Sequence, residues 1–351
     1  MYQHHISEGM NASDVVITMV GGLGLTVSSR FARSLRETGA RCRLVLLLPS
    51  SPSSESLVET LREWDVWPHY FQTAKAPYAS LKGNRAKLVR YFAALDYLRR
   101  ESVAHTGGRV LLADSRDVIF QRDPFTIPAD PARPLDVFLE DYFRDFSNSG
   151  INQGHVTPCF GTEAVRRTLL APPRPVSCSG VTLGTYHSIT RYLRLMWSEM
   201  HSSRYSDACL QHDQAFHNWL LWSGKLSPVR TWSNEEGPVT TIGWPEHLYR
   251  DRFGRVLNRR GVLVHIVHQY DRRKRLVASL GRRYALVDKP ETPPRTTAPV
   301  DTTAAFSSDG WLKSAGSGRG SRGGRLTMRR REPEAPLTDG RIGVDADNLV
   351  P

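Results

Sequence analysis

The chain has 351 residues, a formal net charge of +12, and a composition that is 40% hydrophobic and 23% charged. These proportions are typical of a soluble globular protein. No segment reaches the roughly 20 apolar residues that a membrane-spanning helix needs, and the polar first residues do not resemble a secretion signal. We therefore expect a cytoplasmic protein with no transmembrane segment.

The four cysteines, Cys42, Cys159, Cys178 and Cys209, are scattered along the chain without a Cys-x-x-Cys pair or a zinc-ligand spacing. Cysteines of a cytoplasmic protein are mostly reduced. The sequence therefore predicts four free thiols rather than disulfides or a structural metal.

Composition divides the chain into three parts. Residues 1–13 form a polar N-terminal extension, and residues 14–288 alternate short apolar runs with longer amphipathic ones. Residues 289–351 are rich in Pro, Thr, Ser, Gly and Arg, which is typical of a disordered tail. We expect one folded domain followed by a basic tail that is solvated rather than bound to nucleic acid.

In the first half of the domain, apolar runs alternate in chain order with amphipathic ones. The expected strands are residues 14–20, 43–48, 67–72 and 109–113, and the expected helices are residues 31–37, 56–64 and a longer one with Leu88, Tyr91, Phe92, Leu95 and Leu98 on one face. Strands separated by helices indicate βαβ units and a mostly parallel, doubly wound sheet.

The second half, residues 131–288, has a mixed pattern. Strands are expected at residues 136–140, 176–183 (broken by Gly180) and 262–267, with helices at residues 189–200 and 212–222. The fold class predicted for the whole domain is α/β.

Two carboxylates, Asp114 and Asp117, come directly behind the expected strand at residues 109–113. Ligands of open α/β sheets bind beyond the carboxyl ends of the strands, where two carboxylates can converge on a hard divalent cation. The spacing is Asp-x-x-Asp rather than Asp-x-Asp, and a helix cap beside a solvated turn residue gives the same pattern. A shared metal site is therefore one of two interpretations.

The run from Val110 to Phe125 resembles the central block of a family of GT-A-type glycosyltransferases, in which a strand ends in Asp-x-Arg-Asp-Val before Phe-Gln and Asp-Pro-Phe. Three further blocks resemble that family in the same order: residues 178–184, the helix that opens with Asp213-Gln214 and contains Asn218, and residues 267–272 with His-Gln-Tyr-Asp-Arg. The resemblance covers about residues 14–280. It implies a GT-A-like fold, with a Rossmann-like nucleotide-binding half at 14–130 and an acceptor half at 131–288.

The resemblance also implies a cofactor and its ligands. Asp114 and Asp117 are similar to the carboxylates that hold Mn²⁺ or Mg²⁺ and the nucleotide ribose, and His268 is similar to a third metal ligand. His265, three residues before His268, is the alternative ligand. A histidine at the end of a strand also occurs without any metal.

Donor contacts are implied at four further residues. Arg85 and Arg90 are expected to contact the diphosphate, although a solvated basic helix face is an equal interpretation. Ser179 and Gly180 are expected to let the backbone approach the sugar closely, or else to mark a bulge.

Asp213 and Gln214 are the expected catalytic residues. Asp213 is either a general base in an inverting reaction or a donor-orienting group in a retaining one, and it equally fits a plain helix cap. The function implied is metal-dependent transfer of a sugar from a nucleotide-diphosphate sugar to an unknown glycan, lipid, protein or small-molecule acceptor hydroxyl, with no stable nucleic-acid complex. The alternatives are a nucleotidyltransferase on a similar sheet and a non-catalytic sugar- or nucleic-acid-binding protein.

Overall fold

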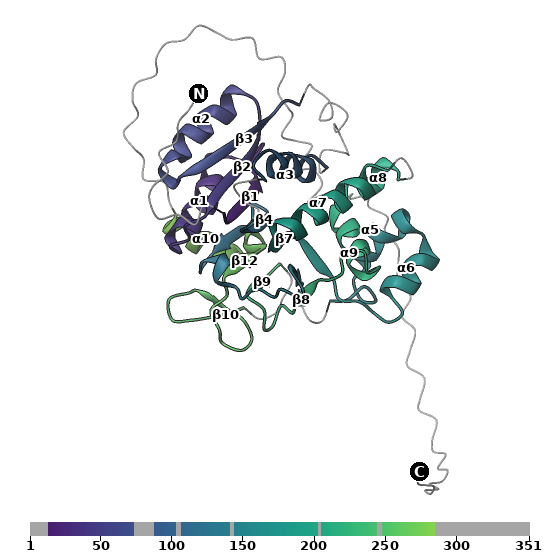
Figure 1. Ribbon diagram of the computed structural model, residues 1–351. Coiled ribbons are helices and arrows are strands. Elements are labelled where there is room, and N and C mark those ends of the chain that lie inside the picture. Colours follow the sequence, from purple (N-terminus) through teal and green to yellow (C-terminus); the bar gives the residue numbers. More distant parts are fainter. Residues whose placement is uncertain are drawn as a thin grey trace, which may run out of the picture. The chain divides into compact units, whose positions relative to one another are not determined.

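A computed structural model describes residues 13–73, 88–102, 107–140, 144–202, 205–243 and 248–284 (Figure 1). Its centre is a seven-stranded sheet with the strand order β3-β2-β1-β4-β7-β6-β8. A three-stranded sheet, β5-β12-β9, and a two-stranded one, β10-β11, accompany it. The predicted α/β class with a mostly parallel central sheet is confirmed.

The first half forms the parallel part of the large sheet. Its elements are β1 (Val15–Met19), α1 (Leu25–Glu37), β2 (Arg43–Pro49), α2 (Pro52–Leu61), η1 (Arg62–Trp64), β3 (Val66–Phe71), α3 (Leu88–Arg100) and β4 (Arg109–Ala113). Strands β3, β2, β1 and β4 run parallel. Each expected strand of this half is present, with ends that differ by at most one residue.

Helices α1 and α3 cover opposite faces of these strands. Phe31 of α1 packs in one core cluster with Val16 of β1, whereas Tyr91 of α3 packs in another with Ile17. Successive side chains of a strand point to opposite faces, so both faces need apolar residues. This explains the nearly continuous apolar run of β2.

Strand β5 (Val118–Phe120) and η4 (Pro124–Thr126) end the first half. The elements of the second half are β6 (Leu135–Leu139), α5 (Gly150–Phe160), α6 (Thr162–Leu169), β7 (Ser177–Thr185), α7 (Tyr186–Met200), α8 (Asp207–Leu210), α9 (Asp213–Trp222), β8 (Arg230–Trp232), β9 (Val239–Thr241), β10 (Tyr249–Arg250), β11 (Val256–Leu257), β12 (Ile266–His268), η5 (Tyr270–Arg272) and α10 (Lys274–Arg283). Strand β7 lies antiparallel between β4 and β6, so this half of the sheet is mixed.

Several elements differ from the sequence-based expectation, among them the late strand and helix α5. The late strand predicted at residues 262–267 is only Ile266–His268, because Val262 belongs to an exposed turn. Helix α5 was not predicted, and it contains Pro158 and lacks a clear apolar face, which are both signals against a helix.

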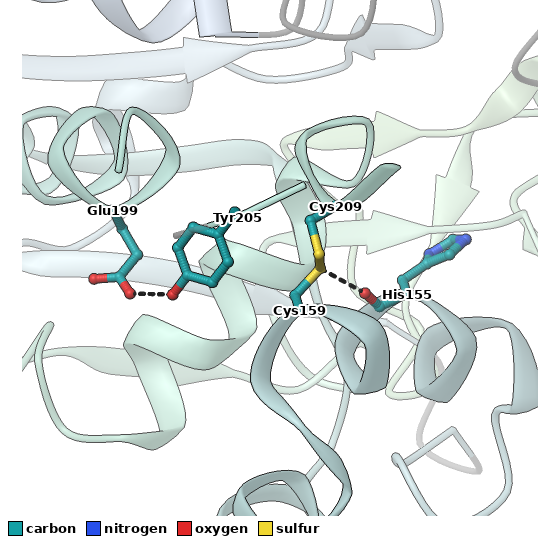
Figure 2. Close-up of a disulfide and its surroundings, with 5 residues drawn as sticks. All are labelled: His155, Cys159, Glu199, Tyr205 and Cys209. Atoms are coloured by element: carbon teal, nitrogen blue, oxygen red, sulfur yellow. Dashed lines mark hydrogen bonds between the residues drawn. A yellow bond between two sulfur atoms is a disulfide. The ribbon is translucent and has the colours of Figure 1, made fainter. Parts of the chain in front are cut away.

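The prediction of four free thiols is wrong for two of them. Cys159, near the end of α5, and Cys209, in α8, form a disulfide across 50 residues of sequence (Figure 2). Cys42 and Cys178 are free and buried, as expected. Spacing did not reveal the pair because the packing of α5 against α8 creates it. Disulfides persist mainly in oxidising compartments, so this bond argues against the predicted cytoplasmic location.

Among the described residues, no helix has the length and apolar character needed to cross a bilayer. The predicted N-terminal extension up to residue 12 and the predicted basic tail lie outside the described residues.

Candidate metal centre

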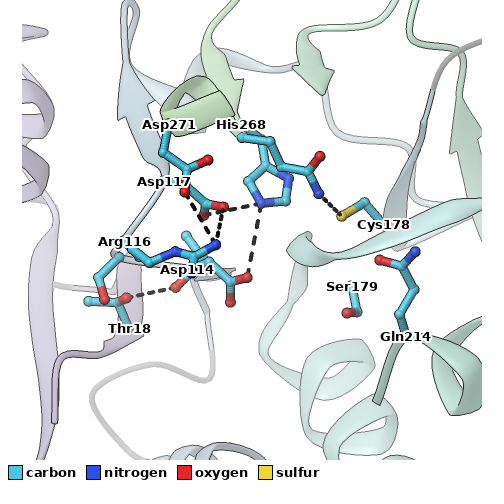
Figure 3. A network of polar contacts seen from close by, with 12 residues as sticks. Thr18, Asp114, Arg116, Asp117, Cys178, Ser179, Gln214, His268 and Asp271 are labelled. Carbon is cyan, nitrogen blue, oxygen red and sulfur yellow. Dashed lines mark hydrogen bonds and ion pairs between the residues drawn. The ribbon is translucent and has the colours of Figure 1, made fainter. Parts of the chain in front are cut away.

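Asp114, Asp117 and His268 come together at the carboxyl end of β4 (Figure 3). Asp114 follows the last residue of β4, and Asp117 immediately precedes β5. Strand β5 pairs antiparallel with β12, in a register that sets Val118 opposite His268. The pairing of two short strands therefore brings a histidine 151 residues further along the chain to the two aspartates.

The three side chains form a compact set of metal-ligand atoms. His268 Nε2 lies 3.4 Å from Asp117 Oδ1 and 4.0 Å from Asp114 Oδ2, and one ligand atom of each residue lies within 4.8 Å of the others. Asp117 and His268 are buried, whereas the side chain of Asp114 is 36% exposed. Solvent therefore reaches these three side chains at Asp114, whereas Asp117 and His268 are shielded from it.

Hydrogen bonds fix the loop that carries the two aspartates. The backbone N–H of Asp114 donates to the Gly180 carbonyl at 2.8 Å, and the Ser115 hydroxyl donates to the Met19 carbonyl at 2.5 Å. On the other side, the Tyr270 hydroxyl donates to the Arg116 carbonyl at 3.0 Å. The Asp-x-x-Asp spacing is therefore part of a tight connection between β4 and β5, and neither aspartate is the cap of a helix.

Gly180 is needed for the close approach of β7 to this cluster. A Cβ atom at residue 180 would lie 2.4 Å from Cε1 of His268 and 2.8 Å from Oδ2 of Asp114. β7 is continuous against β4 here but shifts register against β6, where Val137 pairs with Thr182 and Phe138 with Cys178. The bulge, which the sequence offered as the alternative interpretation of this glycine, is present and lies against the candidate metal ligands.

Electrostatics favour opposite charges on Asp117 and His268. Burial alone would raise the pKa of Asp117, but His268 and Arg116 outweigh it and lower that pKa below its ordinary value. Burial alone would lower the pKa of His268, but the Cys178 thiol and the Asp117 carboxylate outweigh it and raise that pKa well above its ordinary value. Without a cation, a proton on His268 balances the buried carboxylate.

Arg90, on α3, lies beside the cluster and bridges two carboxylates. Its guanidinium pairs with Asp114 at 2.5 Å and with Asp213, and it also donates to the Tyr91 hydroxyl at 2.7 Å and to the Ser179 hydroxyl at 3.4 Å. Four predicted site residues (Arg90, Asp114, Ser179, Asp213) are thereby joined in one polar network. Arg85, the other predicted phosphate contact, lies outside the described residues.

Asp213 and Gln214 form the first turn of α9, as the sequence suggested. The side chain of Gln214 donates to Glu140 at 2.9 Å and to Asn152 at 3.1 Å. Sequence reasoning missed Glu140, which is buried and whose pKa is raised by burial, although Gln214 opposes the shift. Glu140 directly follows β6 much as Asp114 follows β4, and that position was the available signal.

His265 and His268 are both buried, but only His268 faces the aspartates. His265 Nε2 lies 3.1 Å from the Thr126 hydroxyl, and burial lowers its pKa to about 4. Among the described residues, the one group of at least three metal-ligating side chains contains His268 and not His265. Of the two histidines that the sequence left open, the geometry favours His268.

No model of a protein family and no curated protein matches the sequence. Among solved structures, the fold is similar to that of the galactosyltransferase LgtC in complex with donor and acceptor sugar analogs. The similarity covers 79% of this chain and 98% of that chain, at 13% sequence identity and a TM-score of 0.46. At this identity the likeness concerns the fold alone.

Proposed function

We propose that the chain is a divalent-metal-dependent glycosyltransferase that moves a sugar from a nucleotide-diphosphate sugar to an acceptor hydroxyl. The observation that carries the proposal is the group formed by Asp114, Asp117 and His268 at the carboxyl end of β4, with Arg90 beside it. Ligands of open α/β sheets bind at this edge. The four sequence blocks that resemble GT-A-type glycosyltransferases contribute all three of these ligand-type residues.

The residues fit a divalent cation such as Mn²⁺ or Mg²⁺. Two ligands at about 2.1 Å from one ion are at most about 4.2 Å apart. His268 Nε2 lies 3.4 Å from Asp117 Oδ1 and 4.0 Å from Asp114 Oδ2, so the histidine can share an ion with either carboxylate. Carboxylate oxygens with one imidazole suit Mn²⁺ and related hard to borderline ions. When bound, such an ion supplies Lewis-acid stabilisation of the negative charge on a leaving diphosphate.

Arg90 is proposed to contact the diphosphate. Its guanidinium already lies between Asp114 and Asp213, and a planar fork of donors matches phosphate oxygens. A bound diphosphate would replace part of the charge that the two carboxylates now provide. Arg85 is proposed as a second phosphate contact on the strength of the resemblance alone.

Asp213, Gln214 and Glu140 are proposed to hold the sugar and its acceptor. Asp213 also accepts a hydrogen bond from the Tyr91 hydroxyl at 3.1 Å, so two groups of α3 fix its orientation. We therefore assign Asp213 to orienting the donor sugar. Ser179 and Gly180, on β7, are proposed to line the sugar on the side of the metal ligands.

The test is nucleotide-sugar turnover with and without Mn²⁺, preceded by a thermal-shift panel of UDP-, GDP- and dTDP-sugars to find the donor. Asp117→Asn should lower turnover by at least about 100-fold, which corresponds to about 2.7 kcal/mol, and should abolish the Mn²⁺-induced rise in melting temperature. The matched control is Asp65→Asn, which changes an exposed carboxylate outside the candidate metal centre. Turnover that survives both Asp117→Asn and chelation would refute the proposal.

A further inference from the structure

A second feature of the molecule lies in the segment from Tyr249 to Val262, which we call the basic loop pair. Strands β10 and β11 form its first turn, and a bridge between Leu257 and Leu263 closes its second. Of the five exposed large hydrophobic side chains in the described residues, three belong to this segment: Tyr249 (42% exposed), Phe253 (68%) and Val262 (50%). Exposed apolar side chains this close together in the sequence make the segment a candidate interaction surface.

The same segment carries a cluster of positive charge. It holds Arg250, Arg252, Arg255, Arg259 and Arg260, all exposed, of which Arg255 pairs with Asp251 and Arg260 with Glu236. The guanidinium carbons of Arg252 and Arg255 lie 4.7 and 5.5 Å from the centroid of the Phe253 ring. The most exposed aromatic side chain in the described residues is therefore flanked by two cations, and the partner surface must be both anionic and apolar.

In the first turn, backbone N–H groups donate hydrogen bonds to oxygen atoms of the same turn. The Asp251 carboxylate accepts from the N–H of Phe253 and of Arg255, both at 2.9 Å, and Gly254 N–H donates to the Asp251 carbonyl at 3.0 Å. Arg255 Nε also pairs with Asp251 at 2.7 Å, which rigidifies the tip. A rigid tip that presents an apolar ring with satisfied backbone donors can enter an environment poor in water at low cost.

The second turn is built in the same way. The Asn258 side-chain oxygen accepts from the N–H of Arg260 at 3.1 Å and of Val262 at 3.0 Å, and Gly261 N–H donates to the Asn258 carbonyl at 3.0 Å. Unlike Tyr249 and Phe253, the aliphatic Val262 offers no face on which the bases of single-stranded nucleic acid could stack. Arginines that keep their charge at the water boundary while neighbouring apolar groups enter the acyl region are typical of peripheral membrane binding.

We propose that the basic loop pair is a membrane-contact site that docks the protein on an anionic lipid surface, with Phe253 and Val262 entering the interface and the arginines contacting lipid phosphates. This goes beyond the proposed transferase activity and does not depend on it. Membrane attraction of this kind combines apolar burial with a charge term that salt screens.

The first test measures sedimentation of the full chain with phosphatidylcholine vesicles and with vesicles that contain roughly one third phosphatidylglycerol. The protein should bind the anionic vesicles preferentially. Phe253→Ser leaves every charge in place, including those of the tail, and should weaken that binding by about tenfold. Ile151→Ser, at an exposed apolar side chain on α5, is the matched control and should bind like the unchanged protein.

The second test measures whether residue 253 enters the acyl-chain region of the membrane, and it uses variants that still bind vesicles. Phe253→Trp should add tryptophan fluorescence that brominated acyl chains quench, and Ile151→Trp should not. Equal vesicle binding by Phe253→Ser and the unchanged protein, or equal quenching in the two tryptophan variants, would overturn the proposal. Loss of binding to a single-stranded RNA probe in Phe253→Ser, with vesicle binding intact, would also overturn it and assign the surface to nucleic acid.

Discussion

Two buried histidines lie against the same strand, β7, in opposite chemical settings. His268 lies against Gly180, with the carboxylates of Asp114 and Asp117 at Nε2. His217 lies against Ser177, whose hydroxyl is 2.9 Å from Nε2, and the Tyr192 hydroxyl is 2.9 Å from Nδ1. We call Ser177, Tyr192 and His217 the neutral network.

The partners decide what each histidine can do. Hydroxyl groups satisfy both ring nitrogens of a neutral imidazole, and burial lowers the pKa of His217 to about 4. Carboxylates favour a positive charge near His268, whether a proton or a metal ion supplies it. Burial of a histidine at a sheet therefore does not by itself make it a candidate metal ligand, and the carboxylates near Nε2 are what make His268 one.

The largest effect should come from the neutral network. His217→Ala leaves a cavity and removes a hydrogen-bond partner from both Ser177 and Tyr192, so the free energy of unfolding should fall by about 3 kcal/mol. Urea unfolding measures this loss, with the exposed His187→Ala as control. The Mn²⁺-induced rise in melting temperature should persist in His217→Ala, and its disappearance would mean that the two histidines act as one unit.

A smaller effect is expected at the glycine between β7 and the metal ligands. Gly180→Ala pushes a methyl group against His268 and Asp114, so Mn²⁺ affinity should fall by about 10- to 100-fold. Titration calorimetry measures the change. Gly154→Ala, in α5 with nothing near its would-be Cβ, should leave the affinity unchanged. Equal affinity in both variants would show that His268 and Asp114 do not need their present positions to hold a cation.

The third prediction concerns acid stability. An ordinary histidine titrates near pH 6.5, whereas His217 titrates at about 4 in the folded protein. Between these values the unfolded chain binds a proton that the folded chain does not, so stability falls as pH falls. The loss from this residue should be about 2 kcal/mol at pH 5. Unfolding free energies measured from pH 7 to pH 5 should show a shallower slope in His217→Ala, and an identical slope would contradict this origin.

The parallel half of the fold was predictable because its signals are local. The all-apolar run of β2 and the spaced apolar residues of α3 depend only on neighbours in the chain, since each reports burial on one or both faces. The three-residue strand β5 gave no such signal and was not predicted. Its pairing with β12 nevertheless brings His268 to the aspartates.

Glu140 and the Cys159–Cys209 disulfide show the same limit. A strand ending at Glu140 was predicted, but the interaction of Glu140 with Gln214 depends on how α9 packs against β7. The disulfide depends on the packing of α5 and α8, which bring together segments that are 50 residues apart. Sequence spacing carries no information about such contacts, because loop closure permits many partners at this separation.

The sequence by itself determined the α/β class and the strand that ends at Ala113, because hydrophobic periodicity is a local property of the chain. It also offered Asp114 and Asp117 as a candidate metal pair. The tertiary structure alone decided that His268 rather than His265 faces that pair, and that Gly180 leaves the room for it. The reason is physical: ligand sets and close approaches are distances in space between side chains, and they exist only once β5, β12 and β7 have packed together.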